Sequence, residues 1–172
     1  MTHAAGMRHV VNHADLEWTT EGSPSGRIRF FRKRLSLPTG GERLGCSLYR
    51  IPARSRAWPR HGHLQNEEAV FVLEGTGTLE MDGERATLRA GDYVTMPVGA
   101  AHAHRLLNES DADFVFLCIS TMETPDVVLY PDSGKIGVFV GAAPGGPPEQ
   151  STLKRYLDAS AEVPYWQDEE DR

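Results

Sequence analysis

Two histidine pairs with the same spacing stand in the sequence, and a glutamate follows the first pair closely. His61-Gly-His63 is followed after four residues by Glu68, and His102-Ala-His104 comes later in the chain. In an extended strand, residues two apart point to the same face, so each pair can present both imidazoles to one side. Imidazole and carboxylate form a donor set of intermediate softness, which suits iron, manganese, nickel, cobalt or zinc and is poor for calcium.

We therefore predict one divalent transition metal, with iron, manganese, zinc or nickel as candidates, held by His61, His63, Glu68 and one of the two later histidines. His102 and His104 share parity in a regular strand, so parity does not choose between them. A lone His-x-His pair is more often a surface or hydrogen-bonded feature than a metal site. The ordered combination of two pairs and a carboxylate is what favours metal.

Short β-rich segments separated by Gly, Pro, Asp and Asn make up the middle of the chain. The expected strands are residues 45–51, 68–73, 77–81, 93–96 and 113–119. The Asp82-Gly83 pair supplies the positive φ angles of a hairpin turn. Many short antiparallel strands in 172 residues imply one all-β domain, folded as a sandwich or a closed barrel.

The chain divides into three parts by composition. Residues 1–26 are a polar N-terminal arm, 27–140 are the barrel, and 141–172 are a linker and tail that begin with a Gly/Pro-rich stretch. Residues 151–157 are compatible with a short helix. The alternating segment Arg27–Arg34 is predicted to be one strand with a solvated, charged face.

Composition excludes several classes of function. The formal charge is −6, with no concentrated basic stretch, which argues against nucleic acid as the main partner. No apolar run approaches the ~20 residues of a membrane span, and the N-terminus lacks the apolar core of a secretion signal. Cys46 and Cys118 lie in apolar runs without redox spacing, so we expect free thiols and a cytoplasmic protein.

The ordered motifs resemble the two signature motifs of the cupin superfamily. The first family motif is matched by His61, His63, Glu68 and Gly75, with Ser55 at the place of its leading glycine. The second is matched by Gly91, Pro97, Gly99 and His102, but counting back from its closing Asn108 selects His104. The segment is two residues longer than the family pattern, so a bulge or an extended loop is expected there.

A longer resemblance, to small bacterial cupins, covers the chain from Val10 to Glu169. Its marks are Gly41–Gly45, Ala103–Asn108, the Tyr-Pro-Asp-Ser-Gly-Lys run at 130–135 and Tyr165-Trp166. The resemblance implies a jelly-roll barrel (a double-stranded β-helix) and a homodimer. It favours His104 as the fourth ligand, with His102 as its supporting partner or as the alternative ligand.

The fold hosts many chemistries, so function stays more open than fold. The resemblance implies a metal-dependent enzyme of dioxygenase, isomerase or lyase type acting on a small oxygenated organic molecule. The alternatives are a non-catalytic binder of small molecules or sugars, and a structural metal site. Side chains near the motifs that could act as acid, base or anion contact are Tyr49, Arg50, Arg60, Tyr93, His102 and Arg105. Some resembling proteins are labelled sugar-phosphate isomerases, but the sequence offers only scattered arginines for a phosphate.

Overall fold

The structure, a computed structural model, describes residues 8–169, and its regular secondary structure consists almost wholly of antiparallel strands. Its strands are β1 Thr19–Gly22, β2 Arg29–Arg34, β3 Leu44–Ile51, β4 Ser55–Arg56, β5 Gly62–His63, β6 Glu68–Glu74, β7 Thr76–Met81, β8 Glu84–Arg89, β9 Tyr93–Met96, β10 His104–Asn108, β11 Phe114–Thr121, β12 Asp126–Tyr130, β13 Lys135–Val140 and β14 Leu153–Asp158. Short 3-10 helices occur at His13–Asp15, Leu37–Thr39, Ala100–His102 and Pro148–Gln150. The described residues contain no α-helix, and none of their helices is long and apolar enough to cross a membrane.

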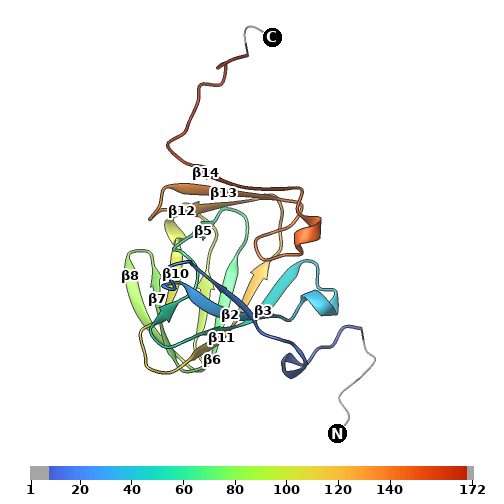
Figure 1. Ribbon diagram of the computed structural model, residues 1–172, viewed down its shortest axis with the longest axis vertical. Helices are drawn as coiled ribbons and strands as arrows, with labels where there is room; N and C mark the ends of the chain where they lie inside the picture. The colour runs from blue at the N-terminus through green and yellow to red at the C-terminus, as the bar shows by residue number, and fades with distance from the viewer. Residues whose placement is uncertain (1–7, 170–172) are drawn as a thin grey trace.

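Three sheets surround the interior. The first has the strand order β1-β2-β3-β11-β6-β9, the second β4-β10-β7-β8, and the third β14-β13-β12-β5. Some neighbours in these sheets are far apart in sequence, as where β3 pairs with β11 along its whole length. Figure 1 shows the third sheet on the side from which the C-terminal segment runs away from the body. The all-β barrel prediction is confirmed.

The core forms where the first two sheets face each other. Strand β11 alternates along its length, burying Phe114, Phe116 and Cys118 while the residues between them are half-buried. Strand β6 contributes Val70 and Val72 in the same way. This period of two is what a strand with one buried face requires. The packed core therefore holds the first two sheets together, and these sheets carry Glu68 and His104.

The predicted strands and the predicted hairpin are confirmed. The segment expected at 93–96 is β9, and the other four expected strands differ from β3, β6, β7 and β11 by one or two residues at their ends. Between β7 and β8, Asp82 has φ 57° and Gly83 has φ 78°. Positive φ at both central positions is the type I′ geometry, which matches the twist of the flanking strands.

The prediction for residues 151–157 is wrong, because these residues form a strand instead of a helix. Strand β14 pairs along its full length with β13, from Lys135 opposite Asp158 to Val140 opposite Leu153. A free neighbouring edge offers backbone hydrogen bonds that override a weak local preference. All six residues of β14 have exposed side chains, so the strand is held by its backbone.

The solvated face expected for the Arg27–Arg34 segment is found only at Arg27 and Arg29, which are exposed. The segment is a strand, but Lys33 is buried and donates a hydrogen bond from Nζ to the carbonyl of His13 at 2.7 Å. Its ammonium group lies 4.8 Å from the ring centre of Trp18. The N-terminal segment thus covers one face of β2, and the opposite face lines the interior. Strand β1, which lies in the predicted N-terminal arm, is the edge strand of the first sheet. The division of the chain at residue 26 stays a prediction.

The two cysteines are free thiols, as expected. Cys118 is buried and Cys46 is half-buried, and burial raises the pKa of both thiols. A raised pKa keeps a thiol protonated and unreactive near neutral pH. The two side chains are therefore packing groups of β3 and β11.

Candidate metal centre

The first histidine pair is fixed by backbone hydrogen bonds to the second. The amide of His61 donates to the carbonyl of His104 at 3.0 Å, and the amide of His104 donates to the carbonyl of His61 at 2.7 Å. The glycine between the two imidazoles allows this approach, since a Cβ at Gly62 would lie 3.1 Å from the Gly99 carbonyl oxygen and 3.2 Å from the Ala103 Cα. The His-Gly-His spacing therefore serves close packing as well as parity.

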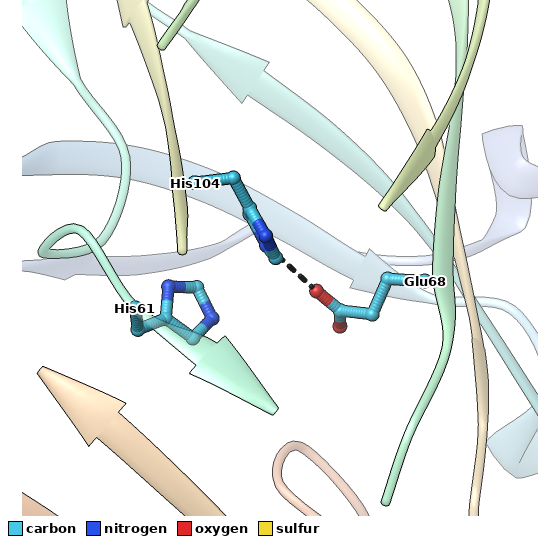
Figure 2. Close-up of side chains that lie close together, drawn as sticks. All are labelled: His61, Glu68 and His104. Carbon is cyan, nitrogen blue, oxygen red and sulfur yellow. Dashed lines mark hydrogen bonds and ion pairs between the residues drawn. The ribbon is translucent and has the colours of Figure 1, made fainter. Parts of the chain in front are cut away.

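Glu68 brings its carboxylate to these imidazoles from the opposite wall. Its Oε2 lies 3.3 Å from Nε2 of His104 and 3.7 Å from Nε2 of His63. Ligand atoms of His61, Glu68 and His104 all lie within 4.8 Å of one another. Figure 2 shows these three side chains pointing toward a common space from separate parts of the chain. His63 lies outside this tightest group, although its ring centre is 5.0 Å from that of His61.

The other ring nitrogen of each imidazole faces a group that can only accept a hydrogen bond. Nδ1 of His61 is 3.0 Å from the Pro59 carbonyl, and Nδ1 of His104 is 3.0 Å from the His102 carbonyl. Nδ1 of His63 is 2.6 Å from Oδ2 of Asp126. Each Nδ1 therefore carries a proton, so that in the neutral form of the ring the lone pair lies on Nε2.

This arrangement fits a cation. In this tautomer, neutral imidazoles at 63 and 104 would turn Nε2 lone pairs toward the Glu68 carboxylate, and acceptors that face one another without a proton repel. A divalent transition metal removes the conflict, because imidazole nitrogen and carboxylate oxygen are the ligands such ions take. The donor chemistry of the three histidines and Glu68 is that of a mixed nitrogen and oxygen metal site.

The protonation states of His61 and Glu68 agree with this fit. Burial, with the neighbouring imidazole of His104, lowers the pKa of His61 to about 3. Burial by itself would raise the pKa of Glu68, but the contact with His104 and the nearby imidazoles bring it to about 2. Near neutral pH the ring of His61 is thus uncharged and the carboxylate is ionised. Both are then in the form that binds metal.

Asp126 is the site residue that the sequence analysis missed. It begins β12, its side chain is fully buried, and its Oδ1 also accepts the backbone amide of Gln65 at 3.1 Å. Burial would lower the pKa of His63, but the hydrogen bond to Asp126 and the charge of Glu68 raise it. A carboxylate behind a metal-binding imidazole orients the ring and strengthens it as a ligand. Nothing in the sequence around Asp126 marks it, since only the pairing of β12 with β5 brings it to His63.

His102 is placed outside the group of converging ligand atoms. It closes the 3-10 helix Ala100–His102, and its Nδ1 lies 3.1 Å from Oδ1 of Asp82 in the β7–β8 hairpin. The short helix absorbs the extra residues of the second motif, so the regular strand that would give His102 and His104 the same parity is absent. His102 supports His104 through its backbone carbonyl.

Most of the other candidate side chains lie away from the site. Tyr49 is buried and lines the interior cavity, whereas Tyr93 is 64% exposed. The arginines among these candidates are engaged elsewhere, Arg50 with Asp113, Arg60 with Asp132, and Arg105 with Glu80 and Asp132. Tyr49 is therefore the one residue of that set that faces the same space as the metal-site side chains.

A cavity of about 1050 Å³ opens beside the converging ligands and is lined by His61, His63 and Glu68. Aromatic rings form part of its wall. Tyr130 stacks on His61 with ring centres 6.0 Å apart, and Trp58 meets the same imidazole edge to face at 6.0 Å. The volume is in the range of sites for small organic molecules. The arrangement can hold a metal ion and a small ligand side by side.

Comparison with known proteins identifies the family. The model of the cupin domain family Cupin_2 matches residues 47–120, which contain both histidine pairs and Glu68. A crystal structure from Silicibacter pomeroyi, described as a sugar phosphate isomerase from a cupin superfamily, aligns with a TM-score of 0.74. That alignment covers 90% of this chain and 96% of the other at 21% identity, so it speaks for the fold. Residues 47–120 of the chain are therefore a cupin domain.

Two curated relatives are dioxygenases by name. Quercetin 2,3-dioxygenase of Bacillus subtilis is 42% identical over 102 residues, which are 57% of this chain and 30% of that protein. Gentisate 1,2 dioxygenase 1 of Aquipseudomonas alcaligenes is 31% identical over 121 residues, 68% of this chain and 33% of that protein. The chain spans about a third of the length of these relatives.

A direct test of the fourth ligand compares His104→Ala with His102→Ala. The first removes a converging Nε2, whereas the second removes a ring bound to Asp82 and leaves the His102 carbonyl in place. We expect His104→Ala to weaken metal affinity by at least about tenfold and His102→Ala to change it little. Metal titration of the two proteins, stripped by dialysis, measures this. Equal retention by both variants would contradict the assignment.

A second test uses Asp126→Asn, which keeps the size of the side chain and removes its charge. This variant is expected to bind metal about 10- to 100-fold more weakly in a metal titration, because His63 loses the partner that fixes its proton on Nδ1. Asp132→Asn is the matched control, since that carboxylate pairs with Arg60 and Arg105 outside the site. Unchanged metal affinity in Asp126→Asn would show that the pair does not tune the site.

Proposed function

We propose that this protein is a metal-dependent enzyme that acts on a small oxygenated organic substrate at a centre of three histidines and one glutamate. The ligands in this proposal are His61, His63, Glu68 and His104. The observation that carries it is the set of Nδ1 contacts, which turns three imidazole lone pairs toward one ionised carboxylate beside a cavity.

The chain's own residues supply binding, orientation and exclusion of water. A bound divalent ion would supply Lewis-acid polarisation of substrate oxygens or, as iron, redox chemistry with oxygen. Glu68 would lower the net charge of the metal centre by one unit, and Asp126 holds the His63 ring in position through its hydrogen bond to Nδ1. Trp58 and Tyr130 shield the imidazole of His61 from bulk water, so electrostatic interactions at the site are stronger than at the surface.

A dioxygenase is the reaction type we favour within this proposal, because two curated relatives that align over more than half of this chain carry that name. Isomerase or lyase chemistry uses the same donor set with manganese, zinc or nickel. The non-catalytic alternative is a small-molecule-binding cupin with the same cavity. The identity of the bound metal and the presence of turnover distinguish the dioxygenase, the isomerase or lyase, and the binding protein.

The proposal is tested with protein purified without an affinity tag, whose histidines would add metal sites. Metal analysis is expected to find about one divalent ion per chain, and Glu68→Gln is expected to lose most of it. Oxygen uptake by the iron-loaded protein is then measured against a panel of enolic and catecholic compounds, with Glu68→Gln as the control.

Iron together with oxygen uptake supports the dioxygenase. Manganese or zinc with turnover of the panel in the absence of oxygen supports an isomerase or lyase. A bound metal without turnover of any compound favours the binding protein. Failure to bind metal, both as purified and after reconstitution, contradicts the proposal as a whole.

We also propose a homodimer, located in the cytoplasm. Residues 159–169 run away from the body (Figure 1), and Tyr165 and Trp166 on this segment are 83% and 66% exposed. Two adjacent exposed aromatic rings are typical of an interface, and two-fold symmetry is the commonest form of assembly. The partner we propose for this segment is a second copy of the chain.

Sedimentation velocity at micromolar concentration tests this assembly. We expect twice the mass of the chain, and a fall to the single mass when Tyr165 and Trp166 are both replaced by Ala. A monomer in the unsubstituted protein contradicts the dimer. The metal proposal is untouched by that result, because the ligands come from one chain.

A further inference from the structure

We propose that Arg32 and Arg34 form an anion-binding subsite in the cavity, which holds a carboxylate or phosphate group of the substrate. The inference deepens the proposed function and rests on it for the part of the substrate that reaches the metal centre. It assigns the substrate to a class, namely molecules with an anionic group at one end and oxygen ligands for a metal at the other.

The two arginines face the cavity because of their positions in β2. Phe30, Arg32 and Arg34 share one face of the strand, and all three line the cavity that also contains the metal-site side chains. Phe31 and Lys33 face the other way, where Trp18 covers them. Successive same-face residues of a strand are about 7 Å apart, so both guanidinium groups can reach one ligand group.

Neither arginine has a carboxylate partner among residues 8–169. Arg32 donates from Nε to Oγ of Ser47 at 3.0 Å and from one terminal nitrogen to the Gly145 carbonyl at 3.2 Å. These two bonds use two of the five N–H groups of a guanidinium. They hold Arg32 in place by neutral acceptors, so its charge remains unpaired and directed toward the cavity.

Arg34 is more exceptional, because its side chain makes no hydrogen bond or ion pair within the described part of the chain, and its Nε is buried without a partner. A buried polar group without a partner is costly and rare. An arginine in this state is accounted for by a ligand that supplies the missing acceptor. Carboxylate and phosphate are the groups that match the guanidinium fork.

The surrounding charges favour an anion at this end of the cavity. Two exposed carboxylates, Glu21 and Glu42, also line it, but neither comes within ion-pair distance of the two arginines. Lys154 and Arg155 of β14 add two positive charges to the lining. The remaining lining carboxylate, Glu68, faces the imidazoles. Outside the metal centre, the lining thus carries four basic side chains against two carboxylates.

An aromatic wall connects the arginines with the metal centre. The Arg32 guanidinium lies 5.4 Å from the ring centre of Tyr49, Tyr49 meets Trp58 at 5.1 Å, and Trp58 meets His61 at 6.0 Å. A ligand bound at both ends therefore lies along these rings. This geometry suits a substrate with a flat or apolar body between its anionic group and its metal-binding oxygens.

The test measures anion binding by the full chain in metal-free form. A bound metal then cannot contribute to the measured affinity, which reports on the arginines. Inorganic phosphate and malonate are titrated calorimetrically into dialysed wild type, Arg34→Met and Arg29→Met. Arg29 is the matched control, since it lies on the same strand, is exposed and does not line the cavity. Arg34→Met is expected to fold normally, because the Arg34 side chain makes no hydrogen bond or ion pair with the described chain.

We expect wild type to bind at least one probe, with affinity that falls as salt rises. Arg34→Met should weaken that binding by at least about tenfold, and Arg29→Met by less than about twofold. Preference for phosphate or for malonate identifies the anionic group. Wild type that binds neither probe, or equal affinities in the two variants, would overturn the subsite.

Metal content is measured in the same proteins before dialysis and after reconstitution, to separate this inference from the proposed function. Normal metal content with no effect of Arg34→Met on the anions refutes the subsite alone. Anion binding that depends on Arg34 in a protein that takes no metal supports the subsite and contradicts the metal-dependent function.

Discussion

The arrangement on which the rest of this structure depends is the meeting of lone pairs inside the barrel. Three backbone or side-chain acceptors hold the Nδ1 protons of His61, His63 and His104, so the opposite nitrogens turn inward toward an ionised carboxylate. A protein interior tolerates such a concentration of acceptors only when a cation joins them. The chemistry proposed for the site follows from that requirement.

The barrel meets the requirement by taking one part of the site from each sheet. Glu68 belongs to the first sheet, His104 to the second, and His63 with its partner Asp126 to the third. No local segment could create this geometry, because a carboxylate and an imidazole on one strand point along the same face instead of toward each other. Arg32 and Arg34 of β2 also belong to the first sheet, and they line the same cavity as Glu68.

Much of the fold was predictable because its signals are local. The period-two pattern of β11 and the Asp82-Gly83 turn each depend on a few consecutive residues, and the ordered histidines carried the family resemblance. The failures have a common physical cause in long-range pairing. β14 became a strand because β13 offered it an edge, and the charges of β2 turned inward because the N-terminal segment covered the other face. Asp126 could not be found, since only the β5–β12 pairing brings it to His63.

The division of the ligands among three sheets also bears on the order of events during folding. His61 and His104 are 43 residues apart in the chain, and their mutual backbone bonds close a long loop. Contacts of this range form late, after the entropy of loop closure has been overcome. The barrel must therefore be nearly complete before the ligands converge, and a metal ion bound there would be the last component to enter.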